Sequence, residues 1–372
     1  MYYFLFLIFC FSLGADPKVI GIIATDKNGV QPWDPDDLKT GITGAEEAII
    51  YISKELVQLG YQVLVLGDPP PNSLYSRPDA NPRYITHKDY EGTHFDIAIL
   101  WRDLVSLKRW KQRSDKIYFW PHDIAIDPCT EAQIKELDDV LWLTEWQRQH
   151  WIHKNPCFTK FTKIFGNGID PASFHPIEER RNPYSCIYAS SYAQGLELLL
   201  DIWPSIKKRF PRATLDLYYG WKHWGILSPQ TEKKMRSQVA RFATLGVTEH
   251  GLVGHDELTK AYETASFWTY PCTRWETFCI SALRAQAAGA IPVCLERTAL
   301  KETVRHGYKC TTREAYFSTL VQALEHAEAI ELADRAKMRD FILQDYTWKA
   351  IAAKWHTLFE GGENHSVSKS QP

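Results

Sequence analysis

Short apolar runs alternate with amphipathic helical segments along almost the whole chain, and this alternation limits the possible folds more than any other feature. Residues 18–24 form an apolar, β-branched run typical of a strand buried on both faces. Residues 45–59 carry apolar side chains at helical spacing and stop at Gly60. Residues 62–66 are again apolar. A strand, a helix and a second strand in this order predict a βαβ unit.

The alternation runs through a first block and then starts again near residue 167. In the first block we expect further strands over 96–100, 116–120, 139–143 and 163–165, and a helix over 145–153. In the second block we expect strands over 185–189, 214–219, 247–252, 267–270 and 291–295, and helices over 195–210, 256–266, 276–289, 313–328, 331–343 and 348–360. Repeated βα units predict open parallel sheets with helices on both faces.

The chain has 372 residues, which is long enough for two domains. A linker rich in turn formers, Gly166-Asn-Gly-Ile-Asp-Pro171, separates the two blocks. We therefore expect a Rossmann-like domain over 17–166, a second Rossmann-like domain over 167–344, and a final amphipathic helix over 345–360.

Both ends of the chain differ from its body. Residues 1–16 contain an almost wholly apolar run with the length of a signal-peptide core, but without the positively charged start of a signal. The run is too short to span a bilayer comfortably. A signal, a membrane anchor and an uncleaved extension therefore stay open, and so do a cytoplasmic, a membrane-associated and a secretory location. The polar residues 361–372 are expected to be disordered.

Charge and cysteine spacing exclude two classes of site. The net charge is -2 and the chain has no basic stripe, so we expect no nucleic-acid partner. The 8 cysteines are scattered, and no pair has the C-x-x-C spacing of zinc or redox sites. The sequence therefore indicates no metal site.

Residues 268–293 place a strand, a loop and a helix in succession, and they read Trp-Thr-Tyr-Pro-Cys-Thr-Arg-Trp-Glu-Thr-Phe-Cys-Ile-Ser-Ala-Leu-Arg-Ala-Gln-Ala-Ala-Gly-Ala-Ile-Pro-Val. We expect the helix to start at Glu276 and Thr277 and to end at Gly289. Unpaired N–H groups at a helix start can bind hydroxyl or phosphate oxygens, and a carboxylate there can accept hydrogen bonds from sugar hydroxyls. The plain alternative is that Glu276 is only a helix-start charge that stabilises the helix dipole.

This segment resembles the donor-binding motif of the retaining glycosyltransferases with the GT-B fold, the family 4 or group 1 type, which reads E-T-F-C-I-S-A-L-E-A-Q-A-A-G. Five other segments resemble parts of the same family in the same order. They are residues 40–47, 118–123, 142–148, 166–174 and 189–199. The resemblance covers roughly residues 18–360.

The resemblance implies a GT-B architecture, in which two Rossmann-like domains turn their parallel sheets toward a central cleft. The first domain would face the acceptor and the second would hold the donor. The implied reaction moves a hexosyl-type sugar from a nucleotide-diphosphate donor to a hydroxyl of a glycan, lipid or other acceptor, with retention of configuration. It needs no metal and no cofactor besides the nucleotide sugar as co-substrate. Peripheral membrane association stays open.

The resemblance also assigns roles to residues. Glu276 and His122 would orient the donor sugar, and they are the expected catalytic residues. Glycines in the 40–47 loop would let backbone amides approach the diphosphate. The expected donor-binding residues are Gly41, Gly44, Gln194, Arg274, Thr277, Phe278, Cys279 and Arg284.

Two positions depart from the family pattern. Arg284 stands where the family has a second Glu that holds the ribose hydroxyls, and a guanidinium can only donate hydrogen bonds, so the ribose contact must be different or absent. Gln194 stands where the family has a basic residue beside the diphosphate. The loss of one charge-assisted hydrogen bond costs on the order of 1.5–3 kcal/mol. We expect Arg284 or Arg274 to supply the missing positive charge.

Two other functions are compatible with these departures. The first is a weak or inactive homologue that binds a sugar or a nucleotide without turnover. The second is a sugar-nucleotide epimerase with the GT-B fold.

Overall fold

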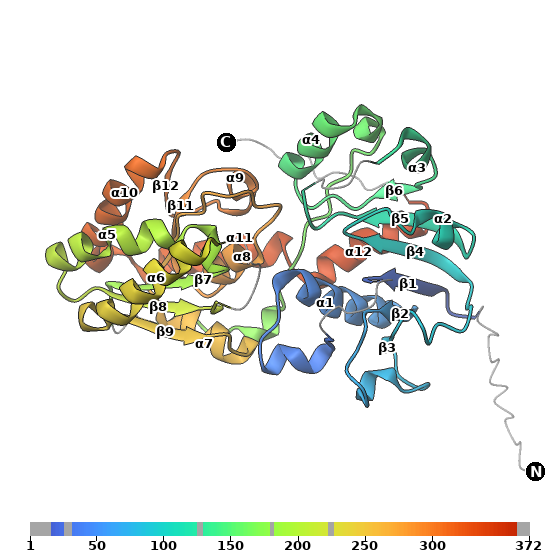
Figure 1. The fold of residues 1–372 in the computed structure, drawn as a ribbon, viewed down its shortest axis with the longest axis horizontal. Helices are drawn as coiled ribbons and strands as arrows, with labels where there is room; N and C mark the ends of the chain where they lie inside the picture. The colour runs from blue at the N-terminus through green and yellow to red at the C-terminus, as the bar shows by residue number, and fades with distance from the viewer. Residues whose placement is uncertain (1–15, 26–31, 125–128, 179–181, 222–226, 363–372) are drawn as a thin grey trace, which may run out of the picture.

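The computed structural model describes residues 16–25, 32–124, 129–178, 182–221 and 227–362. Most of the apolar segment 1–16 and of the tail 361–372 lies outside these residues, so both expectations stay predictions. The described chain forms two parallel six-stranded sheets with helices around them (Figure 1). Among the described residues, no helix is long and apolar enough to cross a membrane.

The strands of the first sheet are β1 (Val19–Ile23), β2 (Gln62–Leu66), β3 (Arg83–Ile85), β4 (Phe95–Trp101), β5 (Ser114–Trp120) and β6 (Asp139–Val140). Those of the second sheet are β7 (Ser185–Ala189), β8 (Thr214–Tyr218), β9 (Val247–Gly251), β10 (Phe267–Tyr270), β11 (Ile291–Leu295) and β12 (Tyr308–Cys310).

The α-helices of the described chain are α1 (Gly44–Gln58), α2 (Leu107–Lys111), α3 (Glu131–Lys135), α4 (Glu145–Lys154), α5 (Leu196–Arg209), α6 (Pro229–Phe242), α7 (His255–Thr264), α8 (Ile280–Ala287), α9 (Leu300–Thr303), α10 (Arg313–Glu325), α11 (Leu332–Asp345) and α12 (Trp348–Phe359).

The two sheets have the same topology. The first has the strand order β3-β2-β1-β4-β5-β6, and the second has the order β12-β11-β10-β7-β8-β9, which is the same order within its own block. The neighbouring strands are parallel, as in the pairing of Ile20 with Val63 on one side and with Ile97 on the other. The prediction of two parallel α/β sheets is confirmed. In each sheet the direction of the strand connections reverses between two central strands, which are β1 and β4 in the first sheet and β7 and β10 in the second. Open α/β sheets bind their ligands at this point.

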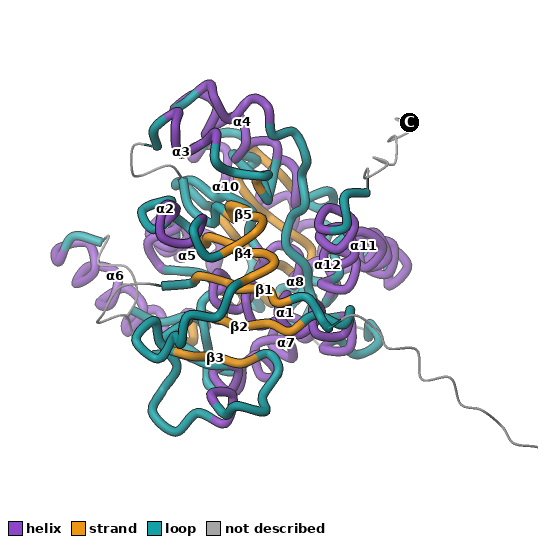
Figure 2. Tube along the Cα trace, turned by 90° about the vertical axis from the view of Figure 1, so that its right-hand side faces the viewer, coloured by secondary structure: helices purple, strands orange, loops and turns teal. Residues whose placement is uncertain are grey.

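Strands of the first sheet are buried on both faces, which explains their continuous apolar runs. Ile20 and Ile22 of β1 belong to the same buried cluster as Ile49 of α1. The next residue, Ile23, faces the other way and packs in a cluster with Trp110 of α2. Figure 2 shows the strands side by side, with α2 on one side of the sheet and α1 and α12 on the other.

The last helix, α12, packs against the first sheet although it follows the second one in sequence (Figure 1). Just before α12, the chain is bonded to the linker between the domains. The N–H of Ile169 donates to the carbonyl of Tyr346, and the carbonyl of Ile169 accepts from the N–H of Trp348. The ring centroids of Trp120 and Trp355 then lie 4.8 Å apart, edge to face. At the end of α12, Lys18 and Glu360 form an ion pair of 2.7 Å. The exact domain bounds of 17–166, 167–344 and 345–360 stay predictions.

Several elements differ from the sequence-based expectations. The prediction missed the strands β3 and β12 and the helices α2, α3, α6 and α9. The expected strand over 163–165 is reduced to an isolated bridge between Trp142 and Ile164. The expected strand over 139–143 is only two residues long in the structure, although the N–H of Leu141 still donates to the carbonyl of Phe119 in β5.

Candidate active site

A cavity of about 690 Å³ lies where the carboxyl ends of the two sheets face each other. In the first domain its wall is formed by segments that follow β1, β4, β5 and β6. In the second domain its wall is formed by segments that follow β7, β8, β9 and β10. Both halves of the chain therefore contribute to one site, at the sheet edge where α/β proteins bind ligands.

Glu276 lines this cavity, but it does not start a helix as expected. Helix α8 begins at Ile280, four residues later, and the expected helix over 276–289 is wrong at its first turn. The physical reason is the backbone of Cys279, whose φ of 75° is left-handed and cannot continue a helix toward Glu276. The N–H of Glu276 instead donates to the hydroxyl of Thr298, 3.2 Å away. The loop thus holds Glu276 in place without helical hydrogen bonds.

The carboxyl group of Glu276 lies in a poorly solvated environment. The hydroxyl of Tyr270 donates to its Oε1 atom, and the thiol of Cys272 lies 3.9 Å from the same oxygen. Burial raises the pKa of Glu276 to about 7, and the two hydrogen bonds only partly offset this effect. A carboxyl group with a pKa near 7 can accept or donate hydrogen bonds at neutral pH.

His122 follows β5 and also lines the cavity. Its ring packs edge to face against Trp120 with the centroids 4.4 Å apart. Burial lowers the pKa of His122 well below its usual value, and the Arg102 cation lowers it further, so the imidazole is neutral at neutral pH. Its Nε2 atom is buried and has no hydrogen-bond partner among the described residues. A buried polar atom without a partner beside a cavity is suited to a ligand hydroxyl.

Two helices begin at the cavity wall. Helix α1 begins at Gly44, and α8 begins at Ile280. A Cβ atom placed on Gly44 would lie 3.7 Å from the Cδ1 atom of Ile280, so the two helix starts are neighbours. Free N–H groups and the positive ends of both helix dipoles meet here, which makes this end of the cavity favourable for an anion.

The remaining donor-site candidates from the motif differ in their surroundings. Gly44, Thr277, Phe278 and Cys279 line the cavity, whereas Gly41 does not. Gly41 has a φ of 114° and packs against Leu252 of the second domain, where a Cβ atom would lie 2.5 Å from the Leu252 Cγ atom. Gly41 therefore permits close contact between the two domains.

The hydrogen bonds of Thr277 also connect the domains. Its hydroxyl donates to the carbonyl of His122 at 2.7 Å, and its carbonyl accepts from the hydroxyl of Thr144 at 3.0 Å. Phe278 is 2% exposed and packs behind the loop. These contacts fix the loop from Thr273 to Cys279 against the first domain.

Gln194 and Arg274 lie on the same side of the cavity. The Nε atom of Arg274 donates to the carbonyl of Ala193 at 3.0 Å, and no carboxylate among the described residues pairs with its guanidinium. Arg274 is exposed, so its charge can reach a ligand in the cavity.

The sequence analysis expected Arg284 or Arg274 to supply a positive charge to the diphosphate. In the structure, Arg284 instead contacts two side chains of the protein. Its Nη2 atom lies 2.6 Å from the Oε1 atom of Glu47, which belongs to α1 of the first domain. The same Nη2 atom lies 2.9 Å from Nδ1 of His255. All three residues line the cavity.

Besides Glu47, the sequence reasoning assigned no role to two other charged residues of the cavity wall, Arg102 and Asp123. Arg102 directly follows β4 and has a φ of 74°, and its Nε atom lies 3.1 Å from Asp123. Its Nη1 atom lies 3.6 Å from Glu46. Arg102 and Glu46 also line a smaller cavity of about 170 Å³ in the first domain. A charged residue at the carboxyl end of a central strand was the available signal for Arg102.

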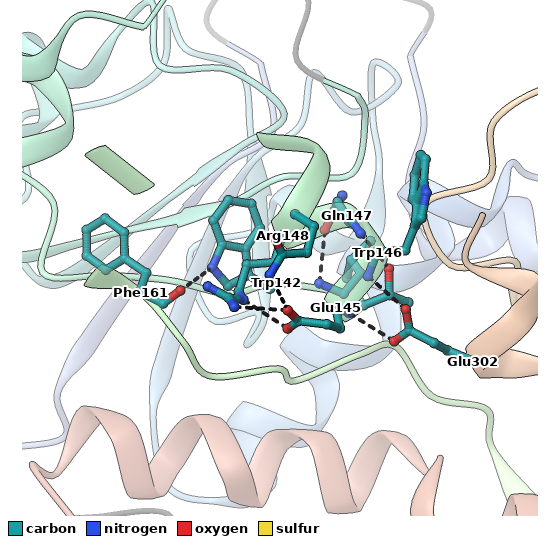
Figure 3. A network of polar contacts seen from close by, with 10 residues as sticks. Trp142, Glu145, Trp146, Gln147, Arg148, Phe161 and Glu302 are labelled. Carbon is teal, nitrogen blue, oxygen red and sulfur yellow. Dashed lines mark hydrogen bonds and ion pairs between the residues drawn. The ribbon is translucent and has the colours of Figure 1, made fainter. Parts of the chain in front are cut away.

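A carboxylate of the second domain binds the start of a helix of the first. The carboxylate of Glu302, on α9, accepts hydrogen bonds from the backbone N–H groups of Glu145 and Trp146 at 2.9 and 2.7 Å. Figure 3 shows Glu302 reaching the first turn of α4 from the neighbouring domain. A carboxylate at this place pairs with unsatisfied N–H groups and with the helix dipole, and so fixes the start of α4 against the second domain.

Residues 184–332, from β7 to the start of α11, match the protein family described as glycosyl transferases group 1. No curated protein is significantly similar to the chain in sequence. Solved structures resemble nearly the whole chain at low sequence identity. Sucrose-phosphate synthase from Thermosynechococcus elongatus has a TM-score of 0.66 and 16% identity, over 92% of this chain and 98% of its own.

Two further solved structures have the same overall arrangement. HepE from Anabaena, in complex with UDP and glucose, has a TM-score of 0.67 and 13% identity, over 93% of this chain and 100% of its own. A glycosyltransferase from Rickettsia africae has a TM-score of 0.68 and 11% identity, over 94% of this chain and 100% of its own. Identities this low establish a common fold. Residues 184–332 are therefore a group 1 glycosyl transferase domain, and the described chain has the two-domain GT-B fold of glycosyltransferases.

Proposed function

We propose that the protein transfers a hexosyl-type sugar from a nucleotide-diphosphate donor to a hydroxyl acceptor, with retention of configuration and without a bound metal. The observation that carries this proposal is the arrangement of the 690 Å³ cavity. Two helix starts meet at one part of it, and the polar groups of Glu276 and His122 line another. A nucleotide sugar has a matching division into a doubly charged diphosphate and a neutral, hydroxyl-rich ring.

The diphosphate would lie at the starts of α1 and α8. Backbone N–H groups in the first turns have no partner within their helices, and they can bind phosphate oxygens without moving. Arg274 would add a positive charge from the second domain. These groups stabilise the charge that grows on the diphosphate as its bond to the sugar breaks.

The sugar would lie between Glu276 and His122. The neutral His122 can bind a sugar hydroxyl through Nε2, and Glu276 can bind others through its carboxyl oxygens. In the proposed reaction the sugar carbon exchanges its bond to the diphosphate oxygen for a bond to the acceptor oxygen on the same face. The proton of the acceptor hydroxyl passes to the departing diphosphate. The side chains position and stabilise, and none of them forms a bond to the sugar.

The acceptor would enter from the first domain. Arg102 lies on the walls of both the large and the small cavity, so a hydroxyl compound bound in the small cavity would lie next to the donor. Trp33 and Trp101 line the small cavity and offer apolar faces beside the carboxyl group of Glu46.

UDP-glucose is the first donor to test, because HepE has also been solved in complex with UDP-glucose. A thermal-shift screen should compare UDP, GDP and ADP with their glucose conjugates, and a stabilising ligand raises the melting temperature through mass action. We expect one nucleotide and its sugar conjugate to raise the melting temperature of the full chain. If none of them does at millimolar concentration, the proposed donor site is wrong.

Two measurements address the finer parts of the proposal. NMR of the product gives the configuration of the transferred sugar, and inversion would contradict retention. Transfer measured with and without EDTA tests metal independence, and loss of activity in EDTA would contradict it. Incubation of a nucleotide sugar alone distinguishes an epimerase, which interconverts two nucleotide sugars, from a transferase.

A further inference from the structure

Three buried side chains from three helices meet at the wall of the large cavity. Glu47 comes from α1 of the first domain, and His255 and Arg284 come from α7 and α8 of the second domain. They are 4%, 6% and 5% exposed, respectively. Arg284 forms the ion pair of 2.6 Å with Glu47, and Nε2 of His255 lies 3.6 Å from the other carboxylate oxygen of Glu47. The cluster is therefore shared between the two domains.

The contacts fix the protonation of the three groups. A guanidinium only donates hydrogen bonds, so Nδ1 of His255 must accept one from Arg284, and the proton of the ring lies on Nε2. That proton points to the side of Glu47. Burial lowers the pKa of His255 to about 4, so the ring is neutral at physiological pH. The cluster therefore contains one positive and one negative charge, and each comes from a different domain.

We propose that the ion pair of Glu47 and Arg284 is a latch that holds the two domains closed over the donor cavity. Glu47 and Arg284 are thus positioning residues. When the domains separate, both charges regain water. When they close, each charge loses water and is stabilised by the other. Removal of one charge therefore penalises the closed form, in which the remaining charge stays buried, and leaves the open form almost unchanged.

The link between this latch and donor binding rests on the proposed function, whereas the latch itself does not. The cavity is built from both domains, so a nucleotide sugar that touches both walls binds the closed form. If a variant is closed for only a fraction of the time, its apparent dissociation constant rises by the inverse of that fraction. A tenfold smaller closed fraction thus gives roughly tenfold weaker binding.

A glycine at the same interface provides a second, uncharged test. A Cβ atom on Gly254 would lie 2.1 Å from the carbonyl oxygen of Lys39 in the first domain. The backbone of Gly254, with φ of -66° and ψ of 164°, is one that alanine adopts without strain. Gly254→Ala therefore leaves the second domain intact and obstructs only the closed arrangement.

The experiment measures small-angle X-ray scattering of the full chain, without ligand and over a titration with UDP. The variants are Glu47→Gln, Arg284→Gln, the charge-swapped double variant Glu47→Arg with Arg284→Glu, and Gly254→Ala. The matched control is Glu232→Gln, which removes a carboxylate from the surface ion pair of 2.7 Å with Arg236 on α6. Circular dichroism confirms that each variant is folded.

We expect Glu47→Gln, Arg284→Gln and Gly254→Ala to increase the radius of gyration without ligand and to raise the UDP concentration for half-maximal compaction by about tenfold or more. The charge-swapped variant should return toward the wild-type values, because the neutral His255 ring can adopt its other tautomer. The control should behave as wild type.

The latch proposal is overturned if folded Glu47→Gln and Arg284→Gln have the same radius of gyration and the same response to UDP as the wild type. An expanded charge-swapped variant would overturn it too, because the pair would then act through packing and not through charge. If the wild type does not bind UDP, the donor assignment fails, and the comparison of the ligand-free variants still decides whether the latch exists.

Discussion

The hydroxyl of Thr277 donates a hydrogen bond of 2.7 Å to the backbone carbonyl of His122, and this bond joins the loop from Thr273 to Cys279 of the second domain to the sheet edge of the first. Thr277 thereby ties the loop that carries Glu276 to the strand end that carries His122. The two side chains with the expected sugar contacts are held at a fixed separation by a bond between their immediate neighbours. Their geometry depends on domain closure.

Removal of this bond should weaken catalysis more than folding. Thr277→Val keeps the shape of the side chain and loses the donor, at a cost of about 1 kcal/mol to the closed form, which is roughly a fivefold loss in kcat/KM. Thr277→Ser should keep most of the activity, because it retains the hydroxyl. A Thr277→Val enzyme with unchanged kcat/KM would show that the bond does not matter for the reaction.

His122 should contribute to sugar binding and not to nucleotide binding. His122→Phe keeps an aromatic ring beside Trp120 and removes the unpartnered Nε2 atom. The loss of one neutral hydrogen bond of about 0.5–1.5 kcal/mol predicts a weakening of UDP-glucose binding by about two- to tenfold. Calorimetry should find unchanged affinity for UDP alone. Equal losses for both ligands would assign His122 to the nucleotide or to the structure of the cavity.

Glu276 should make stability depend on pH in the neutral range. Its folded-state pKa of about 7 lies above the ordinary value of 4.5, so the folded protein holds a proton that the unfolded chain releases. The stability linked to this proton is complete below the unfolded pKa and is lost as the pH rises through 7, and it amounts to on the order of 3 kcal/mol.

Thermal unfolding of wild type and Glu276→Gln between pH 5 and 8 measures this effect. The melting temperature of the wild type should fall relative to that of Glu276→Gln as the pH rises, because the amide does not ionise. Parallel curves would mean that Glu276 has an ordinary pKa in the folded protein.

Arg274 should supply the positive charge that Gln194 lacks. Arg274→Gln removes a guanidinium that lines the cavity, and one charge-assisted hydrogen bond of about 1.5–3 kcal/mol predicts about 10- to 100-fold weaker UDP binding. Arg241→Gln, on the exposed side of α6, is the control for a change in net charge. The two variants should also differ in salt dependence. If both bind UDP equally well, Arg274 is not a diphosphate ligand.

Glu302 should stabilise the start of α4 from the other domain. Thr144 already accepts the N–H of Gln147, and Glu302 takes those of Glu145 and Trp146. Glu302→Ala should lower the free energy of unfolding by about 1–2 kcal/mol, whereas Glu314→Gln in the exposed first turn of α10 should change it little. Urea denaturation measures the free energy of unfolding of both variants. Equal effects would show that the hydrogen bonds from Glu302 to the start of α4 add no stability.

Two parallel α/β sheets could be predicted because parallel strands buried on both faces leave continuous apolar runs. The order of the strands within each sheet was not predicted and is given only by the structure. Helix α6 was missed although Met235, Val239 and Phe242 recur at helical spacing, because the rest of the helix is strongly polar. The start of α8 could not be predicted, since the left-handed backbone of Cys279 falls on a residue type with no preference for that conformation.

The ion pair of the latch could not be predicted either. Glu47 and Arg284 are 237 residues apart in the sequence, and their contact depends on how the two domains close. The motif drew attention to Arg284 as a departure from the family pattern, but its partner is visible only in three dimensions. The sequence thus identified Arg284 as unusual, and the structure shows that Glu47 and His255 are its partners.

The most direct test of the proposed transfer measures sugar release from the donor in wild type and Glu276→Ala. UDP-glucose and, in parallel, the glucose conjugates of GDP and ADP are incubated with the full chain and a panel of sugar and lipid acceptors, and free nucleotide and glycosylated products are quantified by mass spectrometry. We predict a product with one added hexose in the wild type and a loss of at least about 100-fold in Glu276→Ala, with UDP still bound. Absence of product with every nucleotide sugar, or equal turnover in Glu276→Ala, would contradict the assignment of this cavity as the transfer site.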